Sequence, residues 1–163
     1  MRISAFGLAL DSPPGWDVRI RLRQPASEPI AARTHPVLHT ANFALPEERG
    51  DFGSGAVEGM GPGQAFVALI EYHPGSARSA LFSSNAGMPR YVGTGDFSPR
   101  QLQRTIPGQG GTQVFFVEGG RAFCLYIVLG SMANRGRVVP RVNATLHSIE
   151  IVSRGATERV GAL

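Results

Sequence analysis

The end of the chain constrains the fold most, because it predicts a strand, a short helix and a final strand in that order. Arg121–Leu129 has the length and composition of a buried strand, and Gly119-Gly120 before it predicts a tight hairpin with residues 112–118. Apolar residues then recur at helical spacing and lead into a strand over 149–152. This expected helix, with Pro140 in its first turn, has its apolar positions at Val138, Val139, Val142, Leu146 and Ile149.

Strict alternation of apolar and polar residues predicts another strand near the start of the chain. Over residues 16–23 every second side chain is apolar, and the opposite face carries Arg19, Arg21 and Arg23. Residues 64–72 are apolar on both faces, which predicts a central strand. Further strands are expected at 3–10 and 36–45.

Glycine- and proline-rich segments separate these elements. Ser98 can cap a short helix that ends near residue 104, because Pro99 suits the first helical position. Another short helix at 54–60 is an alternative to irregular structure. The expected connections are a polar loop at 24–34, a long glycine-rich segment at 47–63 and irregular structure at 74–95.

Together these elements predict one α+β domain over residues 1–153, followed by a frayed tail over 154–163. Its expected core is a mainly antiparallel sheet of about six to seven strands covered by two or three short helices. The composition agrees with one globular domain, since 42% of the 163 residues are hydrophobic and 17% are charged.

Composition also bears on location and chemistry. No apolar run reaches the length of a membrane span, and the first residues lack the pattern of a signal peptide, so we expect a cytoplasmic protein. All 16 basic residues are arginine and the formal net charge is +4, which favours a partner with an acidic surface. The arginines are dispersed, so we do not expect nucleic acid as the partner.

Three stretches carry a resemblance to a known family. Residues 6–18 read as a strand, a Pro-Gly-Trp turn and a strand; residues 119–130 enter a strand through Gly-Arg; residues 142–151 leave a helix through a Leu-x-Ser-Ile step. This order resembles the Mog1/PsbP-like α/β/α sandwich superfamily, which includes small bacterial proteins and lipoproteins. The resemblance implies a sandwich fold and a role in binding or assembly. It implies no shared catalytic site, so no functional residue is carried over.

Two sets of residues are candidates for a chemical site. His35 and His39 are four apart, with Glu71 and His73 elsewhere, but in a strand the two histidines would lie roughly 13 Å apart, too far for one metal ion. Cys124 lies within an apolar strand, where a thiol stays protonated and packs as a small hydrophobe. We therefore expect no metal, no cofactor and no catalytic residue among them.

The glycine-rich segment at 47–63 does not match either of the two common kinds of phosphate-binding loop. It contains no Gly-Lys-Ser/Thr sequence and lacks the dinucleotide spacing of glycines. We interpret it as a flexible connection or a loop that contacts a partner.

The arginine face, Arg19, Arg21 and Arg23, is the hypothetical partner-binding site. On one side of a strand these residues stand roughly 6.5–7 Å apart, a spacing that suits a carboxylate-lined surface. The alternative is a solvated sheet face, or one covered by a helix with acidic partners such as Glu47 or Glu48. In a sandwich fold, three arginines on one face imply an edge position or buried ion pairs. The leading hypothesis is a non-enzymatic binding or accessory protein, an adaptor or subunit. The alternatives are a small-ligand carrier with an apolar cavity, or an enzyme whose site combines His73 with Glu71 or Asp96.

Overall fold

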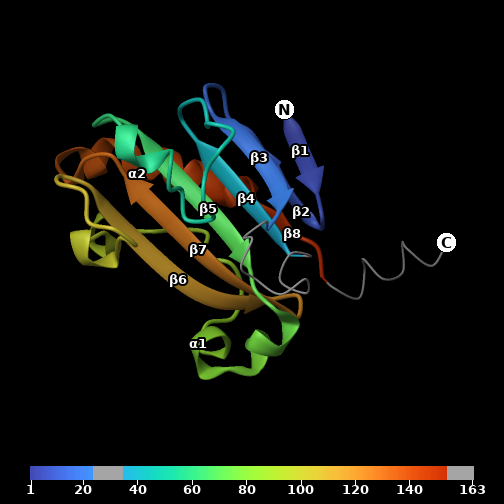
Figure 1. The fold of residues 1–163 in the computed structure, drawn as a ribbon. Helices are drawn as coiled ribbons and strands as arrows, with labels where there is room; N and C mark the ends of the chain where they lie inside the picture. Colours follow the sequence, from blue (N-terminus) through green and yellow to red (C-terminus); the bar gives the residue numbers. More distant parts are fainter. Residues whose placement is uncertain (24–34, 154–163) are drawn as a thin grey trace.

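The computed structural model describes residues 1–23 and 35–153, which form two antiparallel sheets and one long helix (Figure 1). The larger sheet has five strands, and each neighbouring pair is antiparallel. Across the sheet they are β3 (Asp17–Leu22), β4 (Pro36–Ala41), β5 (Ala65–Glu71), β7 (Arg121–Leu129) and β6 (Gly110–Glu118).

The smaller sheet joins the beginning of the described chain to its end. β1 (Arg2–Ala5) and β2 (Leu8–Asp11) form a hairpin, and β8 (Glu150–Ile151) pairs with the other side of β2. The helix α2 (Arg135–Ser148) follows β7 and leads into β8. The predicted strand, helix and strand are therefore present, but the two strands lie in different sheets.

The central part of the larger sheet is covered on both faces. Its back face packs against α2, where Val142 and Leu146 join a core with Val67, Leu125 and Ile127; Figure 1 shows the helix behind the sheet. The central strands β5 and β7 are buried along their whole length. Their mostly apolar sequences, without alternation, follow from this double burial.

A long connection, residues 42–64, covers much of the front face of the sheet, and Phe82 of the short helix α1 (Ala80–Ser83) packs on Phe115 at one end of it. Phe52 packs on a buried cluster that includes Phe66. The connection lies close against the end of β7, because Gly130 has no side chain: a Cβ atom there would lie 1.9 Å from the carbonyl oxygen of Gly61.

The outer edge of β6 is closed by neighbouring segments. Gly111 exchanges two backbone hydrogen bonds with Ser98, at 2.9 and 3.0 Å. Farther along the strand, the amide of Val117 donates to the carbonyl oxygen of Asn85. Open strand edges recruit other strands, so this edge is protected from such pairing.

The α+β class and the antiparallel pairing are confirmed, whereas the finer description is corrected. The described chain has eight strands in two sheets instead of six to seven in one sheet. Of the helices, α2 is long and α1 (Ala80–Ser83) is a single turn; the 3-10 helices are η2 (Val57–Gly59), η3 (Pro74–Arg78), η4 (Thr94–Asp96), η5 (Pro99–Gln101) and η6 (Met132–Asn134). The loop expected at 24–34 and the tail expected at 154–163 lie outside the described residues.

The prediction of one strand over residues 3–10 is wrong, because the chain reverses direction within this segment. Phe6 and Gly7 form the turn between β1 and β2, with φ angles of 53° and 75°. Arg121 holds this turn by donating to both of their carbonyl oxygens. The turn was hidden in the sequence because an aromatic residue occupies it, with 51% of its surface exposed.

The short helices were only partly predictable. The expected helix at 98–104 is the single 3-10 turn η5, although Ser98 caps it as predicted by accepting a hydrogen bond from the amide of Arg100. The alternative helix at 54–60 reduces to η2. In α2, Pro140 is the sixth residue and lies beyond the first turn, which costs the helix one backbone hydrogen bond.

Candidate functional site

The front face is organised in rows that run across all five strands. One row contains Arg19, His39, Ala68, Tyr126 and Gln113, each directly opposite the next on the neighbouring strand. Residues paired in this way point to the same side of a sheet, and three strand spacings from β3 to β7 span roughly 14 Å. The arginine face therefore shares a surface with Tyr126.

The arginine face lies on the edge strand β3, one of the two positions expected for it. Arg19 has 47% of its side chain exposed and forms ion pairs with Asp17 at 3.3 Å and Glu47 at 3.7 Å. The ion pair with Glu47 agrees with the alternative interpretation, in which acidic residues of the chain itself neutralise this face. Exposed pairs of this kind contribute little to stability, so the Arg19 guanidinium can exchange partners.

The other two arginines are bound more closely by the connection. Arg21 donates to the carbonyl oxygen of Arg49. Arg23 donates from Nε to Asp51 at 2.9 Å, lies over the ring of Tyr72, and has only 10% of its side chain exposed. Of the three arginines, Arg19 is thus the most accessible to a partner.

His39 lies beneath this polar cluster and is neutral. Its Nδ1 accepts a hydrogen bond from Nε of Arg49, and its Nε2 faces the carbonyl oxygen of Asp51 at 2.8 Å. Burial, together with the charges of Arg49 and Arg21, lowers the pKa of His39 to about 3.

A buried ion pair lies at the end of β5, on the side of the sheet where Arg23 packs over Tyr72. Arg121 donates to both carboxylate oxygens of Glu71, at 2.9 and 2.8 Å. His35 lies 4.0 Å from Glu71, and the rings of His35 and His73 are 6.2 Å apart. Among residues 1–23 and 35–153, no group of three or more His, Cys, Asp or Glu side chains is placed to hold a metal ion.

Of the three residues predicted for an enzyme site, His73 and Glu71 lie at one end of the sheet and Asp96 lies apart from them. The Asp96 carboxylate accepts a hydrogen bond from the amide of Gly93, close to the start of β6. Glu71 lies in the row that ends at Phe116 on β6. Phe116 is farther along β6 than Gly111, the residue near which Asp96 lies. Since Gly111 and Phe116 are separated by roughly 17 Å of strand, Asp96 and Glu71 lie at different ends of the sheet.

Cys124 is fully buried within the front-face cluster. Burial raises the pKa of its thiol to about 12. A thiol that stays protonated is a poor nucleophile, which agrees with its interpretation as a packing residue.

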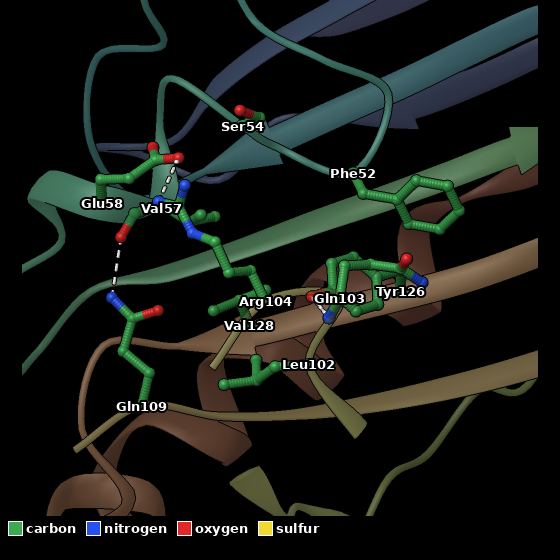
Figure 2. A pocket seen from close by; sticks show the side chains of 10 residues that line it. All are labelled: Phe52, Ser54, Val57, Glu58, Leu102, Gln103, Arg104, Gln109, Tyr126 and Val128. Atoms are coloured by element: carbon green, nitrogen blue, oxygen red, sulfur yellow. Dashed lines mark hydrogen bonds and ion pairs between the residues drawn. The ribbon is translucent and has the colours of Figure 1, made fainter. Parts of the chain in front are cut away.

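The front face also contains a small pocket, called the front pocket (Figure 2). Its volume is about 100 Å³, and it is open to solvent on one side. Three segments form it: the connection, residues 102–109, and β7. The lining residues are Phe52, Ser54, Val57, Glu58, Leu102, Gln103, Arg104, Gln109, Tyr126 and Val128.

Half of the ten lining side chains are aromatic or aliphatic, and most of the exposed lining surface is apolar. The rings of Phe52 and Tyr126 meet edge to face, with centroids 5.3 Å apart. The phenol oxygen of Tyr126 accepts a hydrogen bond from the amide of Gln103, and burial raises the pKa of this phenol. At the rim, Arg104 forms an ion pair with Glu58 at 3.1 Å.

One polar group in the front pocket, on Gln109, lacks a hydrogen-bond partner in the part of the chain that the structure describes. Gln109 is 3% exposed, and its Nε2 donates to the carbonyl oxygen of Val57 at 2.7 Å. Its Oε1 is buried and has no hydrogen-bond partner among the described residues. In Figure 2 the amide nitrogen is directed at Val57 and the oxygen is turned toward the other lining side chains.

A second hollow of about 470 Å³ lies beside β6. It is wide and open, and polar side chains such as Asp96, Gln101 and Thr112 contribute to its lining. It therefore lacks the enclosed apolar character expected of a cavity that carries a ligand.

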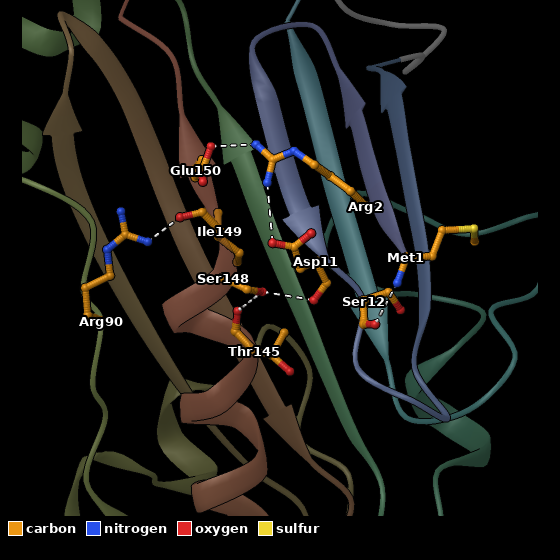
Figure 3. Close-up of polar contacts among 9 residues, drawn as sticks. All are labelled: Met1, Arg2, Asp11, Ser12, Arg90, Thr145, Ser148, Ile149 and Glu150. Carbon is orange, nitrogen blue, oxygen red and sulfur yellow. Dashed lines mark hydrogen bonds and ion pairs between the residues drawn. The ribbon is translucent and has the colours of Figure 1, made fainter.

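The remaining polar cluster joins the small sheet to α2 (Figure 3). Arg2 bridges Asp11 at 3.4 Å and Glu150 at 2.6 Å, which lowers the pKa of Glu150. Arg90 donates to the carbonyl oxygens of Leu146 and Ile149 at the end of the helix. A cation suits a helix C-terminus, so these contacts account for the cluster structurally.

Sequence reasoning missed the front pocket. The aromatic Phe52 within a glycine-rich segment was the one available indication, because a large apolar side chain in a loop usually packs on something. Gln109 gave no such indication, since it follows a Pro-Gly turn where a polar residue is ordinary.

Comparisons with known proteins do not identify the chain. No protein-family model matches it, and no curated protein or solved structure shows significant similarity to it. The resemblance to the Mog1/PsbP-like superfamily thus stays a prediction. Within the described residues, no helix has the length and apolar character that crossing a membrane requires.

Proposed function

We propose that the protein is a non-enzymatic binding or accessory protein that contacts another protein through its front face. The front pocket carries this proposal. It is apolar and open, yet its volume of about 100 Å³ is well below the ~300–1,000 Å³ of sites that take free small molecules. A pocket of this size suits a single anchoring side chain, the element on which protein interfaces depend most.

Two further features support contact through side chains on this face. The edge of β6 is closed by Ser98 and Asn85, so addition of a partner strand there is disfavoured. Arg19 lies in the same row as Tyr126 and is the accessible member of the arginine face. An acidic group of a partner could replace Glu47 as its ion pair.

The alternatives have less support. Ligand carriage would need a larger apolar cavity than the front pocket, and the hollow beside β6 is open and partly polar. An enzyme site that joins His73 with Glu71 would need a free carboxylate, whereas both oxygens of Glu71 accept hydrogen bonds from Arg121. Asp96 lies at the other end of the sheet.

Site-specific photo-crosslinking in the native host tests the proposal. A photoreactive amino acid replaces Glu48, which is exposed on the connection, or Ala144, which is exposed on α2 behind the sheet. We expect a discrete crosslinked partner from position 48 and none from position 144. Arg19→Ser should weaken the crosslink, and Arg141→Ser on α2 is the matched charge control. Equal crosslinking from both positions, or none from position 48, would refute the front face as the binding surface.

A further inference from the structure

The unpartnered oxygen of Gln109 indicates what the front pocket binds. A buried acceptor without a donor destabilises a protein, because it has lost its hydrogen bonds to water and gained none in return. Such a group in a core usually signals a missing partner. Here Gln109 lines a pocket that opens to solvent, so a molecule that enters the pocket can supply the donor.

The orientation of the amide is determined by its neighbour. The carbonyl oxygen of Val57 can only accept, so the NH2 group of Gln109 must face it and Oε1 must face away. Rotating the amide would place two oxygen atoms in contact. The pocket therefore presents a hydrogen-bond acceptor.

No group of the described residues donates a hydrogen bond to Oε1. Arg104 is the nearest cationic side chain in the lining, and its guanidinium is paired with Glu58 at the rim. The amide of Gln103 already donates to Tyr126. The hydroxyl groups of Ser54 and Tyr126 also line the pocket, but neither forms a hydrogen bond with Oε1.

We propose that the front pocket receives the phenol ring of a tyrosine side chain from a protein partner, whose hydroxyl donates to Oε1 of Gln109. This inference rests on the proposed function and names the anchoring group. The ring would pack on Phe52, Leu102 and Val128, and the edge-to-face geometry of Phe52 and Tyr126 provides an aromatic wall for a third ring.

Size and charge select a phenol among the possible donors. A closed cavity of about 150 Å³ holds benzene, so an open pocket of about 100 Å³ can take one six-membered ring that protrudes at its mouth. An indole is larger, and a serine or threonine hydroxyl would leave the apolar floor uncovered. A lysine ammonium would have to lose its hydration beside Arg104.

Two peptides that differ by one hydroxyl test the inference. The probes are acetyl-Gly-Tyr-Gly-amide and acetyl-Gly-Phe-Gly-amide, titrated into the full chain and followed by NMR at the methyl groups of Leu102 and Val128. The tyrosine peptide should bind about tenfold tighter or more. A pocket that uses apolar contacts alone would prefer the phenylalanine peptide, so tighter or equal binding of that peptide overturns the inference.

Substitutions in the front pocket test whether the peptides bind there and whether Gln109 causes the preference for tyrosine. Gln109→Met should abolish the preference for tyrosine, because it removes the acceptor at similar side-chain size. Ser54→Trp should block both peptides from the rim of the front pocket, whereas Ser83→Trp, an equal change at an exposed site on α1, should leave binding unchanged. Binding that survives Ser54→Trp would place the peptide elsewhere and refute the site.

Titration with free phenol distinguishes the two possible sources of the ring, a small molecule and a tyrosine of a protein partner. If phenol binds but the tyrosine peptide is rejected, the pocket takes a small molecule and the assignment to a protein partner is refuted. If the peptide results hold but no partner crosslinks from position 48, the proposed function fails while the chemistry of the pocket stands. If crosslinking succeeds and the tyrosine preference is absent, only the present inference fails.

Discussion

The Nδ1 atom of His39 accepts a hydrogen bond from Nε of Arg49 at 2.9 Å. Because a guanidinium can only donate, the imidazole proton must lie on Nε2, which donates to the carbonyl oxygen of Asp51. A second proton on the ring would turn the acceptor toward Arg49 into a donor. The neutral state is thus built into the packing of the connection on β4.

Stability should therefore fall as the pH drops below about 6.5. The unfolded chain then binds a proton on His39, while the native protein does so only near its pKa of about 3. The free energy of unfolding should decrease by about 2 kcal/mol between pH 6.5 and 5 from this residue, measured by urea unfolding. His39→Gln should flatten this slope, and His147→Gln on the exposed face of α2 should keep it because His39 remains. An unchanged slope in His39→Gln would contradict the assignment.

Replacing Arg121 by methionine should destabilise the protein strongly. The substitution leaves the buried carboxylate of Glu71 without its bidentate partner, which typically costs about 3–5 kcal/mol of unfolding free energy. The double variant Arg121→Met with Glu71→Gln should lose less than Arg121→Met alone. Arg104→Met, at an exposed pair, is the control and should cost about 1 kcal/mol or less. Equal losses in the two arginine variants would show that burial of the pair is unimportant.

Gly7→Ala and Gly15→Ala form a matched pair. Both glycines have positive φ, at 75° and 81°, but a Cβ atom at Gly7 would lie 2.6 Å from Arg121 Nη1, whereas nothing lies within 4 Å at Gly15. Both variants carry the backbone strain of about 1 kcal/mol. We expect Gly7→Ala to lose clearly more stability in thermal or urea unfolding, and a similar loss in both would mean that Arg121 does not pack against this turn.

Cys124 should resist thiol reagents in the native state. With a pKa of about 12, its thiolate fraction near pH 8 is roughly a thousandfold below that of an ordinary thiol. Labelling with a coloured disulfide reagent should be slow in buffer and rapid in urea. Ser83→Cys in a Cys124→Ala background provides an exposed thiol for comparison. Rapid native labelling of Cys124 would show that the front-face cluster opens readily.

The sequence predicted the strands well where one periodicity applied along the whole segment. β3 is half-buried and alternates, β7 is buried and does not, and both were located within a residue or two. The division into two sheets was not predictable, because it depends on the turn at Phe6 and Gly7. That turn is stabilised by Arg121, which lies more than a hundred residues away in the chain.

The candidate site could be predicted only in part. The arginine face follows from alternation within one strand, so Arg19, Arg21 and Arg23 were found together. The front pocket combines side chains from the connection, from residues 102–109 and from β7, which no local pattern relates. The accessibility that separates Arg19 from Arg23 also depends on the connection, since Asp51 reaches Arg23 only after the fold has formed.

The pairing of β2 with β8 has a consequence for how fast the protein folds. Leu8 lies opposite Ile151, and Arg121 reaches back to Phe6, so the smallest sheet closes the largest loops of the chain. Closing such loops costs conformational entropy before the contacts that offset this cost have formed. Chains rich in contacts between distant residues therefore fold slowly. The hairpin of β6 and β7 can form early, while the small sheet must wait for α2 to arrive. Refolding should accordingly take milliseconds to seconds, with the docking of β8 among its last steps.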